Sequence, residues 1–242
     1  MIIRLLNFAA LCAVIYVNYL ANALPINGKT TGELSDNYVN LFVPAGLTFA
    51  IWGLIYLLLM IFSVVQFIPK HQFTAIRPDY LFMFSCVFNI AWILAWHYEL
   101  MAVSILNMLA LLASLALINL HLANGNQTLL KLIFGVYLGW ILIATVANFT
   151  AGLVSVGWSG WGLPEVGWTI IMIAAGLAVA AFCMIKLNNP FLAVAVSWAF
   201  LGIYLKRASD QPMIAYFALF AMTGTILAAA YVVYRMRNSL LA

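Results

Sequence analysis

Aromatic side chains recur at helical spacing in the apolar stretch from Pro44 to Phe67. Phe49, Trp52 and Tyr56 are three and four residues apart, so they share one face of a predicted helix. Such a face is typical of helix packing and of the aromatic belt at a membrane interface. It is also typical of a pocket wall that holds a flat, apolar ligand. Taken alone, the spacing favours packing.

The sequence contains no arrangement of residues typical of an enzyme. It has no nucleophile paired with a base, no metal-ligand spacing and no phosphate-binding loop. Cys12, Cys86 and Cys183 are far apart in apolar segments, which favours small buried side chains over disulfides or metal ligands. A histidine can bind a porphyrin iron, but neither His97 nor His121 has a supporting motif, so both are predicted to be interfacial polar residues. We expect no catalytic site, no metal site and no resident cofactor.

The composition is that of an integral membrane protein. Of the 242 residues, 67% are hydrophobic and 7% are charged, whereas roughly 25% are charged in a typical soluble domain. No basic run suited to nucleic acid is present. We therefore expect an all-α, polytopic membrane helix bundle whose main partner is the lipid bilayer.

Eight apolar segments are predicted to cross the bilayer. They are Ile2–Leu24, Pro44–Phe67, Tyr80–Trp96, Met101–Leu122, Thr128–Thr150, Gly167–Leu187, Pro190–Leu205 and Pro212–Tyr234. The first resembles a cleaved signal peptide, but it is longer than a signal core and carries asparagines on one face, which favours a span. Pro25–Val43 is the one long polar loop. The Gly- and Trp-rich segment 157–164 is predicted to link a five-helix unit, residues 1–156, to an accessory three-helix unit, residues 165–242.

The basic residues predict the orientation. With eight spans both termini lie on one side of the membrane, and that side holds seven Lys and Arg residues against three on the other. The seven are Arg4, Lys70, Arg77, Lys131, Lys186, Arg235 and Arg237, and the three are Lys29, Lys206 and Arg207. Because cytoplasmic loops are enriched in Lys and Arg, we expect an inner-membrane protein with both termini in the cytoplasm. The loop Pro25–Val43 then lies outside.

With this topology, polar and aromatic side chains of five spans converge in the outer half of the bilayer. They include Asn18 and Asn22, Phe49, Trp52 and Tyr56, Asn89, Trp92 and Trp96, Ser104 and Asn107, and Thr145 and Asn148, with Tyr137 and Trp140 nearer the middle. Amides in hydrocarbon require hydrogen-bond partners, and a cluster of amides and rings is typical of a ligand pocket.

Three motifs in this region resemble those of the tryptophan-rich sensory protein family (TspO/MBR, peripheral benzodiazepine receptor-like). Phe88-Asn89-Ile90-Ala91-Trp92, followed by Trp96, is similar to the signature of the family's third helix. Tyr137-Leu138-Gly139-Trp140, followed by Asn148, is similar to the signature of its fifth helix. The second span resembles the family's second helix through Pro44, Phe49, Trp52 and Tyr56. The motifs occur in the family's order and cover about Asn18 to Asn148.

The resemblance implies a five-helix core, here followed by about three additional transmembrane helices. It implies sensing or transport of an apolar planar ligand, such as a porphyrin, a haem-like tetrapyrrole or a sterol. The implied ligand-binding residues are Phe49, Trp52, Tyr56, Asn89, Trp92, Tyr137, Trp140 and Asn148. Rings can stack on the tryptophans, and Asn89 and Asn148 can bond a carbonyl or carboxylate. The alternative is that both asparagines only tie helices together.

Two further expectations follow from the sequence. A secondary transporter or permease for a small molecule is the alternative function, because polar residues within spans can line a path. All six acidic residues lie in loops or at span ends, however, so no titratable group at depth supports proton coupling. A homodimer is the other possibility, because the small residues of the sixth span allow close helix contacts. These are Ala174, Ala175, Gly176, Ala178 and Ala180.

Overall fold

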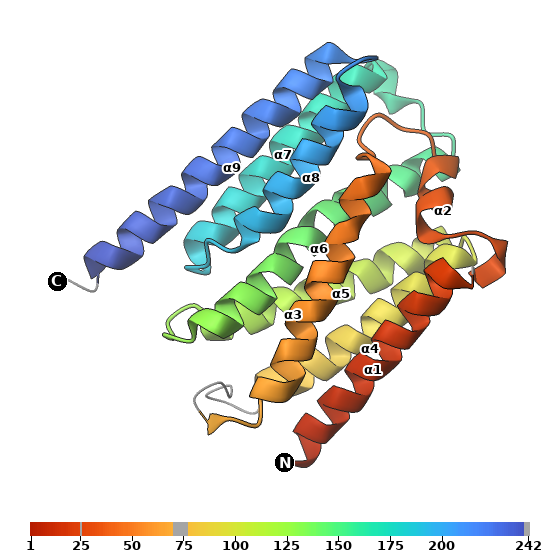
Figure 1. The fold of residues 1–242 in the computed structure, drawn as a ribbon. Coiled ribbons are helices and arrows are strands. Elements are labelled where there is room, and N and C mark those ends of the chain that lie inside the picture. The colour runs from red at the N-terminus through yellow and green to blue at the C-terminus, as the bar shows by residue number, and fades with distance from the viewer. Residues whose placement is uncertain (25, 70–76, 240–242) are drawn as a thin grey trace.

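A computed structural model describes residues 1–24, 26–69 and 77–239 (Figure 1). Its described residues form α-helices and short 3-10 helices and contain no strand, so the predicted all-α fold is confirmed. The α-helices are α1 (Ile2–Ala23), α2 (Thr31–Asn37), α3 (Ile51–Val65), α4 (Arg77–His97), α5 (Met101–Leu122), α6 (Thr128–Ser155), α7 (Glu165–Lys186), α8 (Leu192–Arg207) and α9 (Pro212–Ser239). Three 3-10 helices are η1 (Ile26–Gly28), η2 (Gly46–Ala50) and η4 (Gly160–Gly162). Lys70 and His71, predicted in a basic loop, lie outside the described residues.

The long helices run up and down through one bundle, and α6 lies at its centre (Figure 1). Helix α6 packs against α3, α5, α7 and α8 and is buried along most of its length. Both chain termini lie at one end of the bundle, here called the terminal end, with the α5–α6 and α7–α8 connections. The opposite end, here called the α2 end, carries α2 and the α4–α5, α6–α7 and α8–α9 connections. The start of α1 and the end of α9 therefore lie at the same end of the bundle, as the eight spans predicted from the sequence require.

Seven helical segments are long and apolar enough to span a bilayer, which makes the chain a multi-pass membrane protein. Helix α8 is the exception. It has 16 residues, so it is about 24 Å long, somewhat less than a hydrocarbon core of about 30 Å. It nevertheless runs the length of the bundle between α6 and α9, and its inward face is fully buried. The predicted seventh span is thus a short helix enclosed by its neighbours.

Two glycines allow α8 to lie close to α6 and to η2. A Cβ atom on Gly139 of α6 would lie 2.4 Å from the carbonyl oxygen of Leu192. A Cβ atom on Gly202 of α8 would lie 2.0 Å from Oγ1 of Thr48, which belongs to η2. The backbone N–H of Ala45 also donates to the Gly202 carbonyl at 3.0 Å. The division into a five-helix and an accessory unit stays a prediction, and the two segments share this tight interface.

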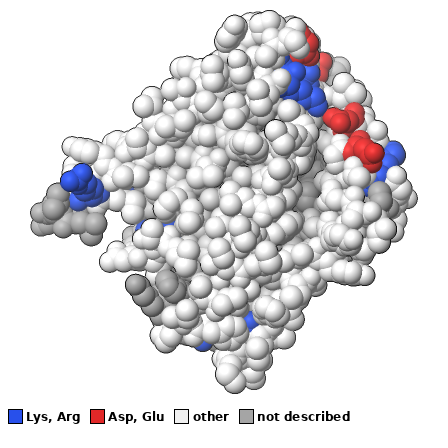
Figure 2. All heavy atoms as spheres, in the orientation of Figure 1, with Lys and Arg blue, Asp and Glu red and all other residues white. Residues whose placement is uncertain are grey.

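Charged side chains are sorted between the two ends of the bundle. Three ion pairs lie at the α2 end. They are Lys29–Glu99 at 3.8 Å, Lys206–Asp36 at 3.1 Å and Arg207–Asp210 at 2.8 Å. On the face seen in Figure 2, acidic atoms appear only toward the α2 end, and basic atoms at the opposite end stand alone. The exterior between the two ends is almost free of charge, as a lipid-facing surface requires.

The small residues of α7 divide between two environments. Gly176 and Ala180 are buried inside the chain, where Gly176 packs against Ile143 and Phe200. Ala174, Ala175 and Ala178 are exposed. Only this second group is available to a neighbouring chain, and a homodimer stays a prediction.

Candidate functional site

The indole of Trp52 is the centre of an aromatic cluster in the α2 half of the bundle. Its ring stacks on Tyr56, with centroids 5.5 Å apart, and on Trp92, with centroids 6.1 Å apart. Tyr137 and Trp140 meet it edge to face at 6.1 and 6.2 Å. Helices α3, α4 and α6 thus place five predicted ligand-binding residues in contact. Phe49, from η2, adds an edge contact to Trp140 at 6.1 Å.

Two cavities adjoin this cluster, and Trp52 lies between them. The first has a volume of about 60 Å³, and its lining includes Phe49, Trp52, Trp92, Trp140 and Asn148. The second has a volume of about 150 Å³, and its lining includes Phe49, Trp52 and Tyr56 together with Asn18 and Asn22 of α1. Among the described residues, none that lines either cavity is charged. Six of the eight predicted site residues therefore face these two spaces.

Three tryptophans that line the first cavity carry indole N–H groups with no acceptor among the described residues. The indole N–H groups of Trp92, Trp96 and Trp140 are buried and unpaired, and all three residues line this cavity. The hydroxyl of Tyr56, which lines the second cavity, is also buried without a partner. A buried donor usually has a partner, because leaving it unpaired costs about 1–3 kcal/mol. Each of these groups could donate a hydrogen bond to an acceptor that the described residues do not supply.

The remaining two predicted site residues, Asn89 and Tyr137, line neither cavity. Asn18 Nδ2 donates to Asn89 Oδ1 at 3.0 Å, and Asn89 Nδ2 donates to the Tyr137 hydroxyl at 3.0 Å. This chain of bonds ties α1, α4 and α6 together behind Trp52. Asn148 does line the first cavity, but its amide is paired with Ser104 at 3.1 and 3.2 Å. A ligand that contacts Asn148 would therefore bind an amide that already bonds to Ser104.

His97 is buried, which differs from the interfacial position expected for it. Its Nδ1 lies 2.8 Å from the Ile93 carbonyl oxygen and must donate to it. Its Nε2 lies 3.5 Å from the hydroxyl of Thr31, because α2 folds over the end of α4. Both ring nitrogens are thus engaged, and His97 lines neither cavity. His121 is exposed at the terminal end, as expected.

The loop between the first two spans forms a lid over the first cavity. Its helix α2 begins with a capping box, in which Thr30 and Glu33 bond each other's backbone N–H groups. The backbone N–H of Thr30 donates to Glu33 at 2.7 Å and its hydroxyl at 2.9 Å, and these bonds lower the pKa of the Glu33 carboxyl. Thr31 and Ser35 then point into the cavity lining. The sequence interpretation missed this helix, although Thr30-x-x-Glu33 is a capping signature.

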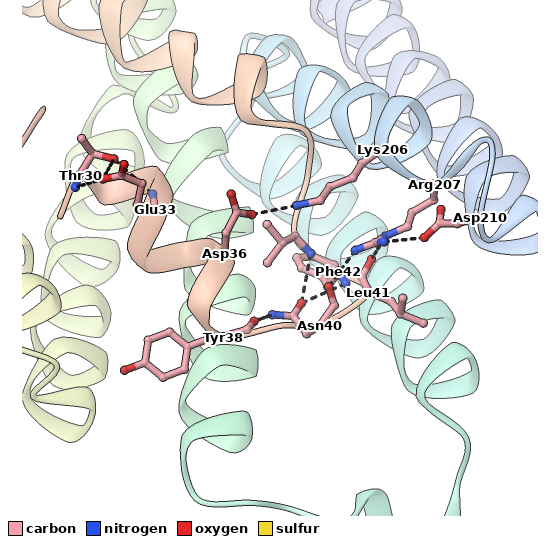
Figure 3. Close-up of polar contacts among 11 residues, drawn as sticks. Thr30, Glu33, Asp36, Tyr38, Asn40, Leu41, Phe42, Lys206, Arg207 and Asp210 are labelled. Atoms are coloured by element: carbon pink, nitrogen blue, oxygen red, sulfur yellow. Dashed lines mark hydrogen bonds and ion pairs between the residues drawn. The ribbon is translucent and has the colours of Figure 1, made fainter.

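Two adjacent cations of α8 hold one side of the lid (Figure 3). Lys206 Nζ donates to Asp36 of α2 at 3.1 Å. Arg207 is largely buried and donates to the carbonyl oxygens of Asn40 at 2.9 Å and Leu41 at 3.1 Å. Its Nη1 also donates to Asp210 at 2.8 Å. The lid therefore rests on α8, a helix of the predicted accessory unit.

The other side of the lid is held by the α4–α5 connection. The hydroxyl of Tyr38 donates to Glu99 at 2.6 Å, and Asn27 Nδ2 donates to the carbonyl oxygen of His97 at 3.1 Å. Burial, and then the bond to Glu99 and its charge, raise the pKa of Tyr38 to about 12. Lys29 forms an ion pair with the same carboxylate. The lid is thus attached on both sides of the cavity.

Helix α8 also positions the residues of η2 beside the cavity. The indole N–H of Trp198 donates to the Thr48 carbonyl oxygen at 2.8 Å. Thr48 directly precedes Phe49, which lines both cavities. Sequence reasoning assigned Trp198 no role at the site, because nothing in the pattern shows that residues 150 positions apart meet. Trp198 supports the cavity wall indirectly.

The motifs, the aromatic cluster and the membrane bundle agree with what comparison with known proteins finds. A family model described as TSPO-like protein matches residues 4–231. That match includes α7, α8 and most of α9 as well as the five spans of the predicted core. No curated protein and no solved structure matches the chain. Since the matched region spans nearly all of the sequence, this chain belongs to the TSPO-like family of membrane proteins.

Proposed function

We propose that this protein is a sensory or translocator-like membrane protein that binds an apolar planar ligand between α3, α4 and α6. A porphyrin, a haem-like tetrapyrrole or a sterol is the class of ligand we expect. The observation that carries this proposal is the group of unpaired indole N–H donors around the first cavity, contributed by Trp92, Trp96 and Trp140. The family membership supports it.

The chemistry of the lining narrows the ligand further. Aromatic rings supply flat apolar surfaces, and the three unpaired indole N–H groups at the first cavity can donate but cannot accept. The ligand should therefore present carbonyl, ester or carboxyl oxygens. No Lys or Arg lines either cavity, so a charged carboxylate placed there would lack a counter-ion. A planar molecule with uncharged acceptors matches these conditions best.

Binding requires the Trp52 indole to move. Pockets for drug-sized ligands have volumes of about 300–1,000 Å³, whereas the two cavities here have volumes of about 60 and 150 Å³. Both cavities share Thr31, Phe49 and Trp52 as wall residues, so displacing the indole would join them. Trp52 is half-buried and forms no hydrogen bond with a described residue. We propose that a planar ligand inserts where this ring now lies.

A haem ligand would be held through its ring rather than through its iron. Neither cavity is lined by a histidine or a cysteine. Among the described residues, no group of three His, Cys, Asp or Glu side chains is placed to hold a metal ion. The aromatic wall and the indole donors suit any planar tetrapyrrole, with or without a metal.

The site is proposed to lie in the outer half of an inner membrane. The termini share one end of the bundle, and the α2 end is the opposite one. The sequence assigns seven basic residues to the terminal end and three to the α2 end, which favours cytoplasmic termini. The lid then faces outward, over the entrance to the cavity.

A titration of the purified protein with protoporphyrin dimethyl ester, followed by quenching of tryptophan fluorescence, tests the proposal. The ester keeps the acceptors and removes the charge. Trp92→Ala should weaken binding about ten-fold, because it removes the ring on which the inserted ligand would stack. Trp161→Ala is the matched control, since Trp161 is 81% exposed and lines neither cavity. Equal affinity of the wild type and Trp92→Ala, with both variants folded, would refute the proposed site.

A further inference from the structure

A third cavity, here called the basic cavity, lies at the terminal end of the bundle and has a volume of about 670 Å³. It is enclosed by the α5–α6 connection, the end of α7 and the last turns of α9. Its lining includes Lys131, Lys186 and Arg235, each from a different helix, and no acidic residue. Three cations thus converge on one space from α6, α7 and α9.

The cations of the basic cavity have only neutral partners among the described residues. Lys131 is buried, and its Nζ donates to the carbonyl oxygens of Ala123 at 3.0 Å and Asn188 at 3.5 Å. Arg235 Nη2 donates to the Ile185 carbonyl at 2.6 Å and to the side-chain oxygen of Asn188. Its Nε and Nη1 groups have no acceptor in the part of the chain that the structure describes. They are free to bind an anion.

This arrangement differs from that of the cations at the α2 end. There Lys29, Lys206 and Arg207 each pair with a carboxylate. Around the basic cavity, no carboxylate of a described residue is among the lining side chains. An anion that enters would therefore be attracted by positive charges and repelled by none of the described lining groups.

The geometry favours phosphate as that anion. A guanidinium with free N–H groups and two ammonium groups can contact several oxygens of one phosphate, and Arg–phosphate contacts are among the stronger hydrogen bonds. Basic pockets between transmembrane helices at the cytoplasmic side bind the headgroups of anionic lipids. The volume of about 670 Å³ exceeds what a phosphate alone occupies, which leaves space for a glycerol headgroup.

We propose that the basic cavity binds a phosphate group, supplied by an acidic phospholipid headgroup or by a soluble phosphate ion. This site is separate from the aromatic cavities and does not depend on the function proposed for them. Asn188 supports it by adopting a left-handed conformation, with φ of 46°, in which its two oxygens contact Lys131 and Arg235. Asparagine tolerates that conformation better than most residues.

Native mass spectrometry of the full-length protein in detergent can test this site. Phosphatidylglycerol and phosphatidylcholine are added in separate samples, and the lipid retained by each protein is measured. The wild type should retain phosphatidylglycerol at least about five-fold better than phosphatidylcholine. Arg235→Gln should weaken retention of phosphatidylglycerol about five-fold to ten-fold. Lys186→Gln is a second test variant, because Lys186 is exposed and its removal should not affect folding.

Arg237→Gln is the matched control. Arg237 carries the same charge two residues further along α9, is exposed and does not line the cavity. The Arg237→Gln variant should retain phosphatidylglycerol within about two-fold of the wild type, because an exposed charge contributes little. Release of the lipid by millimolar inorganic phosphate would assign the site to free phosphate as well, and retention would assign it to the lipid. Equal retention of both lipids, equal losses for Arg235→Gln and Arg237→Gln, or no loss for Arg235→Gln and Lys186→Gln would overturn the proposal.

Discussion

Buried polar side chains gather at two places along α6, and the two groups differ in how they are paired. Toward the terminal end, Asn189 Nδ2 donates to Asn119 Oδ1 at 2.7 Å and to the Lys131 carbonyl at 2.9 Å. Asn189 Oδ1 accepts from the backbone N–H of Phe191 at 3.1 Å, and Asn119 Nδ2 donates to two carbonyl oxygens. Every donor of these two amides has an acceptor. The group ties α5, α6 and the start of α8 together.

In the α2 half of the bundle, three buried indole N–H groups have no partner among the described residues. The indole N–H groups of Trp92, Trp96 and Trp140 adjoin a cavity and have no acceptor. The two groups resemble each other in the sequence, since each consists of amides or indoles within apolar segments. We infer that pairing, rather than residue type, distinguishes a structural contact from a candidate binding site.

Among these variants, loss of the paired amides of Asn119 and Asn189 should lower the free energy of unfolding most. Asn189→Leu leaves the partners of Asn189 unpaired in the interior, which should lower the free energy of unfolding by about 1–3 kcal/mol. Ligand affinity should stay within about two-fold of the wild type. Unfolding in mixed micelles measures the first quantity. Asn107→Leu is the control, because Asn107 bonds only to a carbonyl of its own helix. If both variants lose the same stability, the Asn189 network has no special role.

The two cations that hold the lid should contribute unequally to ligand retention. Arg207 is largely buried and bonds two backbone carbonyls, so Arg207→Gln should speed ligand dissociation about ten-fold. Lys206→Gln removes a pair in which the Asp36 side chain is 70% exposed, and its effect should be less than about two-fold. Stopped-flow dissociation of a bound porphyrin ester gives both rates. Identical rates for the two variants would show that α8 does not hold the lid.

Trp92→Phe should reduce affinity while leaving stability unchanged. It removes one unpaired donor, so an acceptor-bearing ligand should bind about five-fold more weakly, the loss of roughly 1 kcal/mol of hydrogen bonding. The folded protein should be as stable as before or slightly more stable, since no partner is left behind. For Trp168→Phe we expect lower stability and unchanged affinity, because the Trp168 indole donates to the Gly160 carbonyl at 2.7 Å. Lower stability of Trp92→Phe together with lower affinity of Trp168→Phe would contradict the proposed difference between paired and unpaired indoles.

The smallest effect expected is a pH dependence of the lid. The pKa of Tyr38 is raised to about 12 from an ordinary value of 10.0, so the folded protein favours the neutral phenol. Its contribution to stability is therefore complete below pH 10 and is lost as the pH rises toward about 12. Tyr38→Phe should remove this dependence. Proteolysis of the lid between pH 9 and pH 12 measures it, and identical curves for both proteins would argue against the Tyr38–Glu99 bond.

Much of the fold could be predicted because apolar length and helix-breaking residues are local signals. The long helices coincide with the apolar segments predicted to be spans, and most of their ends agree within a few residues. Helix α2 was missed because a seven-residue polar helix has no hydrophobic period, although its capping box could have been read. The short span of α8 could be read from its length, but its enclosure by α6 and α9 depends on contacts far apart in sequence.

The site was predictable in part for the same reason. The spacing of Phe49, Trp52 and Tyr56 placed them on one face, and the family motifs added the partners in α4 and α6. Thr31 and Ser35 could not be predicted as lining residues, because the path of a lid is decided by tertiary contacts such as Arg207 with Asn40. Nor could the sequence decide whether each asparagine is paired with a neighbour.

The most direct test of the central claim is the nuclear magnetic resonance spectrum of indole N–H groups in protein labelled with nitrogen-15 at tryptophan. On addition of the porphyrin ester, the indole N–H signals of Trp92, Trp96 and Trp140 should move, because each group gains an acceptor beside the porphyrin ring. Those of Trp168 and Trp198 should remain in place, since they are already bonded to the carbonyl oxygens of Gly160 and Thr48. A saturated complex in which the three cavity indoles do not move would contradict the account.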